Sequence, residues 1–202
     1  MSGFFDRLRR RVGHDAGRSG SEAGTDDQRF GTGLWRHNRD RFLRAVDRYY
    51  TTALALAEAR TSGDTAESAA ASARDETEGA AVDPTDGTAE HDPIDVIVDG
   101  THRLNSLVPV VDDITAALHR THPVTGQIVP GPARQAVGDA PELLTKASSK
   151  VAEAVLAASM ARSEVPAGKP IGSSAQATER FITDAEELLE RARQNLARLE
   201  RP

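Results

Sequence analysis

The sequence predicts an all-α protein, an antiparallel, up-down four-helix bundle. Four segments, at residues 28–60, 93–121, 141–162 and 174–200, repeat apolar residues with the spacing of an amphipathic helix. They cover more than half of the 202 residues, against roughly one-third in an average globular protein. Only the short stretch 124–129 hints at the two-residue alternation of a strand, so we expect no substantial sheet.

Length and composition bound the organisation of the chain. A chain of 202 residues fits one domain, which we assign to residues 28–202, preceded by a short basic segment at 1–13 and a flexible tether at 14–27. No apolar run is long enough to span a bilayer and no secretory signal is recognisable, so we expect a cytoplasmic protein. Arginine outnumbers lysine by 22 to 3, a bias that resembles proteins of high-GC bacteria.

The first helix, at 28–60, holds five of the eight aromatic residues. An apolar residue recurs at every seventh position, at Trp35, Phe42, Tyr49 and Leu56. This spacing places all four on one stripe of the helix, which we expect to face the core.

The second helix, at 93–121, has the clearest start. Asp92 can cap the free amides of the first turn, and Pro93 loses no hydrogen bond at the first helical position. Pro109 lies inside the apolar pattern, so we expect a kink or a break near Leu107.

The third and fourth helices, at 141–162 and 174–200, complete the predicted bundle. The third carries many alanines, which would let a neighbouring helix approach closely. The core is predicted to consist of the large apolar residues on the four stripes: Trp35, Phe42, Tyr49, Leu104, Val111, Leu118, Leu144, Val151, Phe181, Leu188 and Leu196.

The stretches between these helices are poor in large apolar residues. Residues 61–91 contain only one, Val82, and the span 61–100 carries a net charge of −10. Because such a segment cannot bury enough surface to offset its ordering entropy, we expect a disordered acidic linker at 61–91. Residues 122–140 are rich in proline and glycine and form a loop that either packs as an extended segment or has a role of its own.

The N-terminal segment is predicted to bind a membrane surface or a protein partner. At helical spacing its apolar residues share one face and its arginines lie on the flanks and the opposite side, which is the layout of an interfacial helix on anionic lipid. The alternatives are that the segment docks on the protein's own bundle or is frayed. The binding residues would be Phe4, Phe5, Arg7, Leu8, Arg9, Arg10, Arg11 and Val12.

A second candidate surface is the basic ridge of the first helix, formed by His37, Arg41, Arg44 and Arg48. If the aromatic stripe faces the core, these side chains face water and could hold phosphate, nucleic acid or an acidic protein. The competing interpretation is a solvated helix face whose arginines pair locally with Asp40 and Asp47. The acidic pI of 5.5 argues against nonspecific DNA binding.

Signatures of catalysis and of bound metal are missing from the sequence. Cysteine is absent, which excludes disulfides, thiolate zinc sites and a cysteine nucleophile. No phosphate-binding loop, nucleophile elbow or His-Glu-x-x-His motif occurs. His119 and His122 are spaced as two metal ligands could be, but no third ligand can be named. We therefore predict no cofactor, no metal and no enzymatic activity.

The sequence thus favours a non-catalytic adaptor or accessory protein that acts through protein–protein contacts, peripheral at the cytoplasmic membrane face through residues 1–13. A homodimer is compatible with the long stripes, and nucleic acid is the least favoured partner. One alternative is an enzyme or small-ligand-binding bundle with a pocket under the loop 122–140. The other is a binder of phosphate or nucleic acid through the basic ridge.

Overall fold

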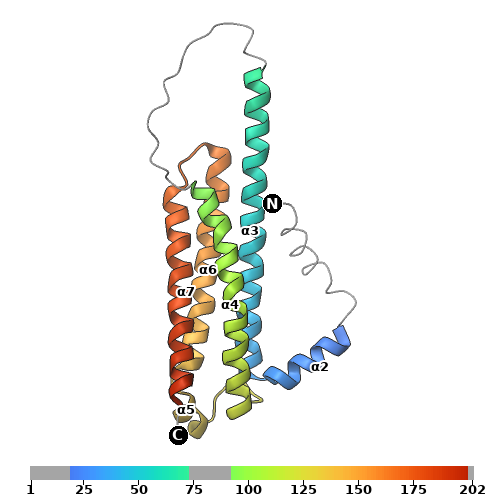
Figure 1. The fold of residues 1–202 in the computed structure, drawn as a ribbon, viewed down its shortest axis with the longest axis vertical. Helices are drawn as coiled ribbons and strands as arrows, with labels where there is room; N and C mark the ends of the chain where they lie inside the picture. Colours follow the sequence, from blue (N-terminus) through green and yellow to red (C-terminus); the bar gives the residue numbers. More distant parts are fainter. Residues whose placement is uncertain (1–18, 73–91, 200–202) are drawn as a thin grey trace.

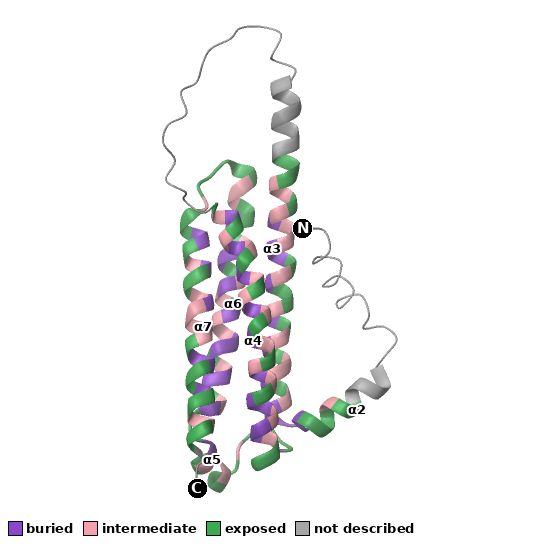
Figure 2. Cartoon of the chain, in the orientation of Figure 1, coloured by how far each residue is buried: buried purple, intermediate pink, exposed green. Residues whose placement is uncertain are grey.

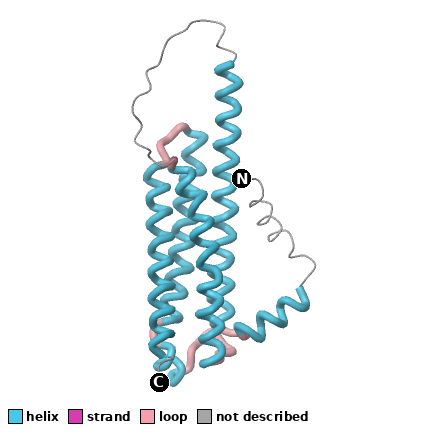
Figure 3. Tube along the Cα trace, viewed as in Figure 1, coloured by secondary structure: helices cyan, strands magenta, loops and turns pink. Residues whose placement is uncertain are grey.

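The computed structural model describes residues 19–72 and 92–199 of the chain. Within these ranges the protein is all-α, as predicted, with no strand (Figure 3). The α-helices are joined by turns and by one short 3₁₀ turn at Val165–Ala167. Their bounds are α2 Ser19–Phe30, α3 Leu34–Ser72, α4 Pro93–Thr121, α5 Gly131–Val137, α6 Ala140–Glu164 and α7 Gly172–Leu199.

The four long helices, α3, α4, α6 and α7, lie side by side and alternate in direction along the chain (Figure 1). Packing concentrates on four pairs: α3 with α4, α6 with α7, α3 with α6, and α4 with α7. The first two pairs are antiparallel and the last two are parallel. The expected antiparallel packing therefore describes only two of the four main contacts, because the long connection between α4 and α6 allows α6 to lie against α3.

The core lies between these four helices (Figure 2). All the core residues predicted from the sequence are buried except Phe181 and Leu196, which are only half-buried. The most deeply buried large residues of α7 are Ile182 and Leu189, which are seven residues apart. Each follows directly after a residue of the predicted stripe, Phe181 or Leu188. A strict seven-residue line drifts around a straight α-helix by roughly 20° per heptad, so it does not locate the buried face of α7 accurately.

Helices α3 and α4 pack tightly at Gly100. Tyr49 of α3 is fully buried, and its hydroxyl donates a 2.7 Å hydrogen bond to the carbonyl of Ile97. A Cβ at Gly100 would collide with the Tyr49 hydroxyl and lie 2.7 Å from Cδ1 of Ile182. Burial raises the pKa of Tyr49 well above its ordinary value, because the anionic phenolate is poorly solvated there.

Helix α2 corrects the prediction of a flexible tether, since residues 19–27 are helical. Its C-terminal half docks through tertiary contacts that a local sequence pattern does not reveal. Phe30 is buried under the guanidinium group of Arg39, 4.2 Å from the ring centroid. Asp26 and Asp27 form ion pairs with Arg36 at 3.6 and 3.1 Å.

Helix α3 corrects the prediction of a linker that is disordered from residue 61, because the helix continues to Ser72 (Figure 1). Residues 61–72 contain four alanines and no proline, so the helix can continue through them even though Gly63 and the serines and threonines have low helix propensity. Near the point where α3 leaves the other helices, Arg60 contacts Asp92 at 2.9 Å and Asp95 at 2.7 Å. The remainder of the predicted linker, 73–91, lies outside the described residues.

Helix α4 has the predicted bounds, and the Asp92 carboxylate accepts a 2.8 Å hydrogen bond from the amide of Ile94. The expected break near Leu107 does not occur. Helix α4 is continuous through Pro109, whose side chain is exposed.

The loop after α4 packs onto the helices instead of standing off them. The indole of Trp35 donates a 2.9 Å hydrogen bond to the carbonyl of His122, and the amide of Leu34 donates one of 2.9 Å to the carbonyl of Gly126. Val124 is buried, and α5 forms within the predicted loop and buries Val137.

Candidate functional site

A groove between α3 and α6 contains three of the four predicted ridge residues. We call it the α3–α6 groove; its volume is about 360 Å³. One wall consists of Arg41, Arg44 and Arg48 of α3, and all three are exposed. The remaining lining residues are smaller or apolar: Ala45, Ser148, Ala152, Val155 and Leu156. His37 is exposed as well, but it does not line the groove.

The position of the arginines follows from the aromatic stripe of α3. Phe42 and Tyr49 are fully buried, which turns the opposite side of the helix outward. The three arginines follow one another at spacings of three and four residues, so they lie along one side of α3 over roughly 10 Å. Ala152 of α6 lines the same groove, and its short side chain leaves the row of arginines accessible.

The acidic residues near the ridge do not neutralise Arg44 and Arg48. Asp40 is paired with Arg36 at 2.9 Å and with Arg39 at 3.3 Å. Among the residues that the structure describes, no hydrogen bond or ion pair holds the side chain of Arg44 or Arg48. The expected local pairing of these arginines is therefore not found, and both guanidinium groups can contact another molecule without first breaking an ion pair within the described part of the chain.

Apolar side chains are exposed on the α6 side of the groove. Leu156, which lines the groove, is 66% exposed, and Met160, one turn further along α6, is 58% exposed. Exposed large apolar side chains are few in the described ranges; Ile128 is the other example. Leu156 was not predicted as a site residue, although its position roughly 140° from the Leu144–Val151 stripe was a signal in the sequence.

Arg41 is loosely connected to α6. One of its terminal nitrogens lies 3.4 Å from the hydroxyl of Ser149, at the long end of the hydrogen-bond range, and the contact is exposed. A bound carboxylate could replace this contact at little cost. The groove thus offers guanidinium donors along one wall and aliphatic carbon along the other.

The other predicted sites have different outcomes. The N-terminal binding residues, Phe4 to Val12, lie outside the described residues. Val124 and Val137 of the 122–140 loop are buried. A pocket lined by His119 and by Pro123, at the start of that loop, lies between α2, α4 and α7.

The described helices carry neither a membrane span nor a metal cluster. In ranges 19–72 and 92–199, no helix combines the length and apolar character that crossing a bilayer requires. The same part of the chain contains no group of three or more histidine, aspartate or glutamate side chains arranged to hold a metal ion.

Comparisons with protein-family models, with curated proteins and with solved structures find no match to this chain.

Proposed function

We propose that the protein is a non-catalytic helical-bundle adaptor that binds an acidic, amphipathic helix of a partner protein in the α3–α6 groove. The observation that carries this proposal is the row of Arg41, Arg44 and Arg48 beside exposed Leu156, with Arg44 and Arg48 unpaired among the described residues. Guanidinium groups favour carboxylate partners, and an exposed leucine next to them favours a ligand that is also apolar.

The shape of the groove supports a helical partner over a membrane or nucleic acid. A groove between two packed helices accepts the apolar face of a third helix, with anchors spaced three, four and seven residues apart. The arginines have this same spacing, so glutamates at matching positions of a partner helix could each face one arginine. A lipid surface is flat and would meet the convex side of a helix more readily than the groove between two helices.

The test uses a short amphipathic peptide with three glutamates at positions i, i+3 and i+7 and leucines on the adjacent stripe. Its binding to the full chain is measured by fluorescence anisotropy. Replacing both unpaired arginines, Arg44→Gln with Arg48→Gln, removes two exposed ion pairs of roughly 0.2–1 kcal/mol each. Affinity should therefore fall roughly 2- to 30-fold.

The matched control is Arg191→Gln with Arg198→Gln, which removes two exposed arginines of α7 that do not line the groove. It should bind the peptide as the original chain does. A peptide with glutamines in place of the glutamates should bind weakly to all variants. Equal loss of affinity in both double variants would mean that only overall charge matters, and it would overturn the assignment of the groove.

We further propose a cytoplasmic location with peripheral contact to anionic membrane through residues 1–13. Support for this comes from the amphipathic pattern of phenylalanines and arginines in that segment. Co-sedimentation with phosphatidylglycerol-containing vesicles tests it by comparing the full chain with a chain lacking residues 1–13. The full chain should pellet with the vesicles, and equal pelleting of both chains would refute the proposal.

A further inference from the structure

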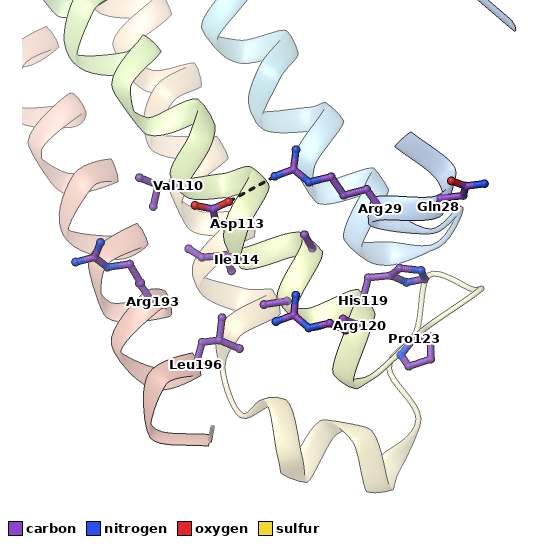
Figure 4. A pocket seen from close by; sticks show the side chains of 12 residues that line it. Gln28, Arg29, Val110, Asp113, Ile114, His119, Arg120, Pro123, Arg193 and Leu196 are labelled. Carbon is purple, nitrogen blue, oxygen red and sulfur yellow. Dashed lines mark hydrogen bonds and ion pairs between the residues drawn. The ribbon is translucent and has the colours of Figure 1, made fainter. Parts of the chain in front are cut away.

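A second and larger pocket lies on the outer face of α4, between α2 and α7 (Figure 4). Its volume is about 860 Å³, within the range of small-molecule sites. It is separate from the α3–α6 groove, and the proposed adaptor function does not account for it. Its lining includes His119 and Pro123, at the start of the loop where the sequence offered a ligand pocket as an alternative.

The pocket has an apolar floor. Val110, Ile114 and Ala117 of α4 lie along it, and Leu196 of α7 lies at one side. Ile114 and Ala117 are buried, while Val110 and Leu196 are half-buried and keep apolar surface available to a ligand. The alanines of α4 create the depression because their side chains are short, and larger residues at Ala116 or Ala117 would fill it.

The rim of the pocket is cationic. Arg29 from α2, Arg120 from α4 and Arg193 from α7 line it, whereas Asp113 is the one carboxylate among its lining residues. Figure 4 shows these side chains around α4, with the contact between Arg29 and Asp113 marked. The lining therefore has a positive balance, although the chain as a whole has a formal net charge of −6.

The ion pairs of Arg29 with Asp113 and of Arg193 with Glu190 are exposed and could exchange for a ligand. Arg29 is 3.5 Å from Asp113 and 3.9 Å from Asp112, and the Asp113 side chain is 81% exposed. Arg193 is paired at 3.2 Å with Glu190 on its own helix, and both are well exposed. Exposed pairs of this kind contribute little, so an anionic ligand could replace them without a large penalty.

The wall on the α2 side is fixed in place. Gly31 has a φ of 70° and lies against the ring of His119, where a Cβ would approach Cε1 to 2.5 Å. His119 lines the pocket, and its Nδ1 is buried without a hydrogen-bond partner in the described part of the chain. The Arg36 contacts to Asp26 and Asp27 hold the rest of this wall against α3.

From these observations we infer that the pocket between α2, α4 and α7 binds a small organic anion with an apolar body, such as a carboxylate or a phosphate monoester on a short alkyl chain. The arginines of the rim would hold the anionic group, and the floor of Val110, Ile114, Ala117 and Leu196 would cover the alkyl chain.

Titration calorimetry on the full chain tests this with three probes: hexanoate, hexyl phosphate and inorganic phosphate. At least one of the alkyl anions should bind, and at least tenfold more tightly than inorganic phosphate. The tighter of the two identifies the head group. Failure of both alkyl anions to bind, or equal binding of inorganic phosphate, would overturn the inference.

Three variants locate the site. Arg193→Gln removes one rim cation and should weaken binding roughly tenfold, the effect of losing one charge-assisted contact. Ala116→Phe fills the pocket and should abolish binding while leaving every charge in place. Arg191→Gln changes an exposed arginine of the same helix outside the pocket and should leave affinity unchanged.

Circular dichroism establishes that each variant keeps its helix content, and amide chemical shifts provide an independent map of the site. In the original chain the shifts should change at residues 110–120 and 193–196 on titration. Shifts confined to other parts of the chain, or unchanged affinity in both Arg193→Gln and Ala116→Phe, would contradict the assignment.

Discussion

The docking of α2 depends on Arg39, and replacing this residue by methionine tests how the N-terminal helix is held. The Arg39 Nε lies 2.7 Å from Asp112, and one terminal nitrogen lies 3.3 Å from Asp26. The guanidinium group also covers the ring of Phe30. Because the side chains of Arg39 and Asp112 are only 13% and 16% exposed, this pair is close to a buried one.

The expected loss of unfolding free energy in Arg39→Met follows from that burial. Breaking a buried ion pair by removing one partner costs about 3–5 kcal/mol, whereas an exposed pair contributes about 0–1 kcal/mol. Loss of the cation–π contact adds about 0.5–2 kcal/mol. Since a small part of both groups remains in contact with water, we expect Arg39→Met to lower the free energy of unfolding by about 2–4 kcal/mol.

Urea denaturation followed by circular dichroism measures this change. The matched control is Arg180→Met, which removes an exposed guanidinium group 5.4 Å from the ring of Phe181 and should cost less than about 1 kcal/mol. Combining Arg39→Met with Asp112→Asn should give a coupling energy of at least about 1 kcal/mol. A loss no larger than that of the control, or additive effects of the two changes, would refute the reasoning.

Three further predictions concern the core. Gly100→Ala should lower the free energy of unfolding by about 1–3 kcal/mol, because the new Cβ collides with Tyr49 and Ile182. The control Gly24→Ala, at a helical site with open space around it, should not lower the free energy of unfolding. Asn38→Leu should raise the free energy of unfolding by about 1 kcal/mol, because the buried Nδ2 of Asn38 has no partner in the described ranges; a loss measured by urea denaturation would contradict this. The raised pKa of Tyr49 means that the unfolded chain loses this proton above about pH 10 while the folded chain keeps it. Unfolding free energy should therefore fall as pH rises above 10, by up to about 1.4 kcal/mol per pH unit from this group, and Tyr49→Phe should remove that part of the slope.

Local pattern was sufficient to predict the all-α character, the bounds of α4 and most of the core. The aromatic stripe from Trp35 to Leu56 is buried as expected, because a strong helical period leaves little freedom in which face is covered. The sequence pattern gave wrong predictions where tertiary contacts determine the structure. The docking of α2 depends on ion pairs and on Phe30, and the parallel packing of α3 with α6 depends on the path of the connection after α4.

The candidate groove could be predicted only on its α3 side. The spacing of Arg41, Arg44 and Arg48 marks an outward row of cations in the sequence alone. The opposite wall depends on which helix packs beside α3, and sequence periodicity does not specify neighbours. The expected pairing of Asp40 with Arg44 is lost for a different reason. Asp40 is held by Arg36 and Arg39 of its own helix, and the Arg36–Asp40 pair has the i, i+4 spacing that the sequence itself shows.

The proposed role of the groove is tested most directly by exchanging charges between the protein and its ligand. The double variant Arg44→Glu with Arg48→Glu should lose affinity for the glutamate-bearing amphipathic peptide and gain affinity for the same peptide with lysines at the three positions. Both changes should shrink at high salt, where exposed charges are screened. If the double variant binds the acidic peptide as tightly as the original chain does, or if it fails to bind the lysine peptide, the groove is not the binding surface.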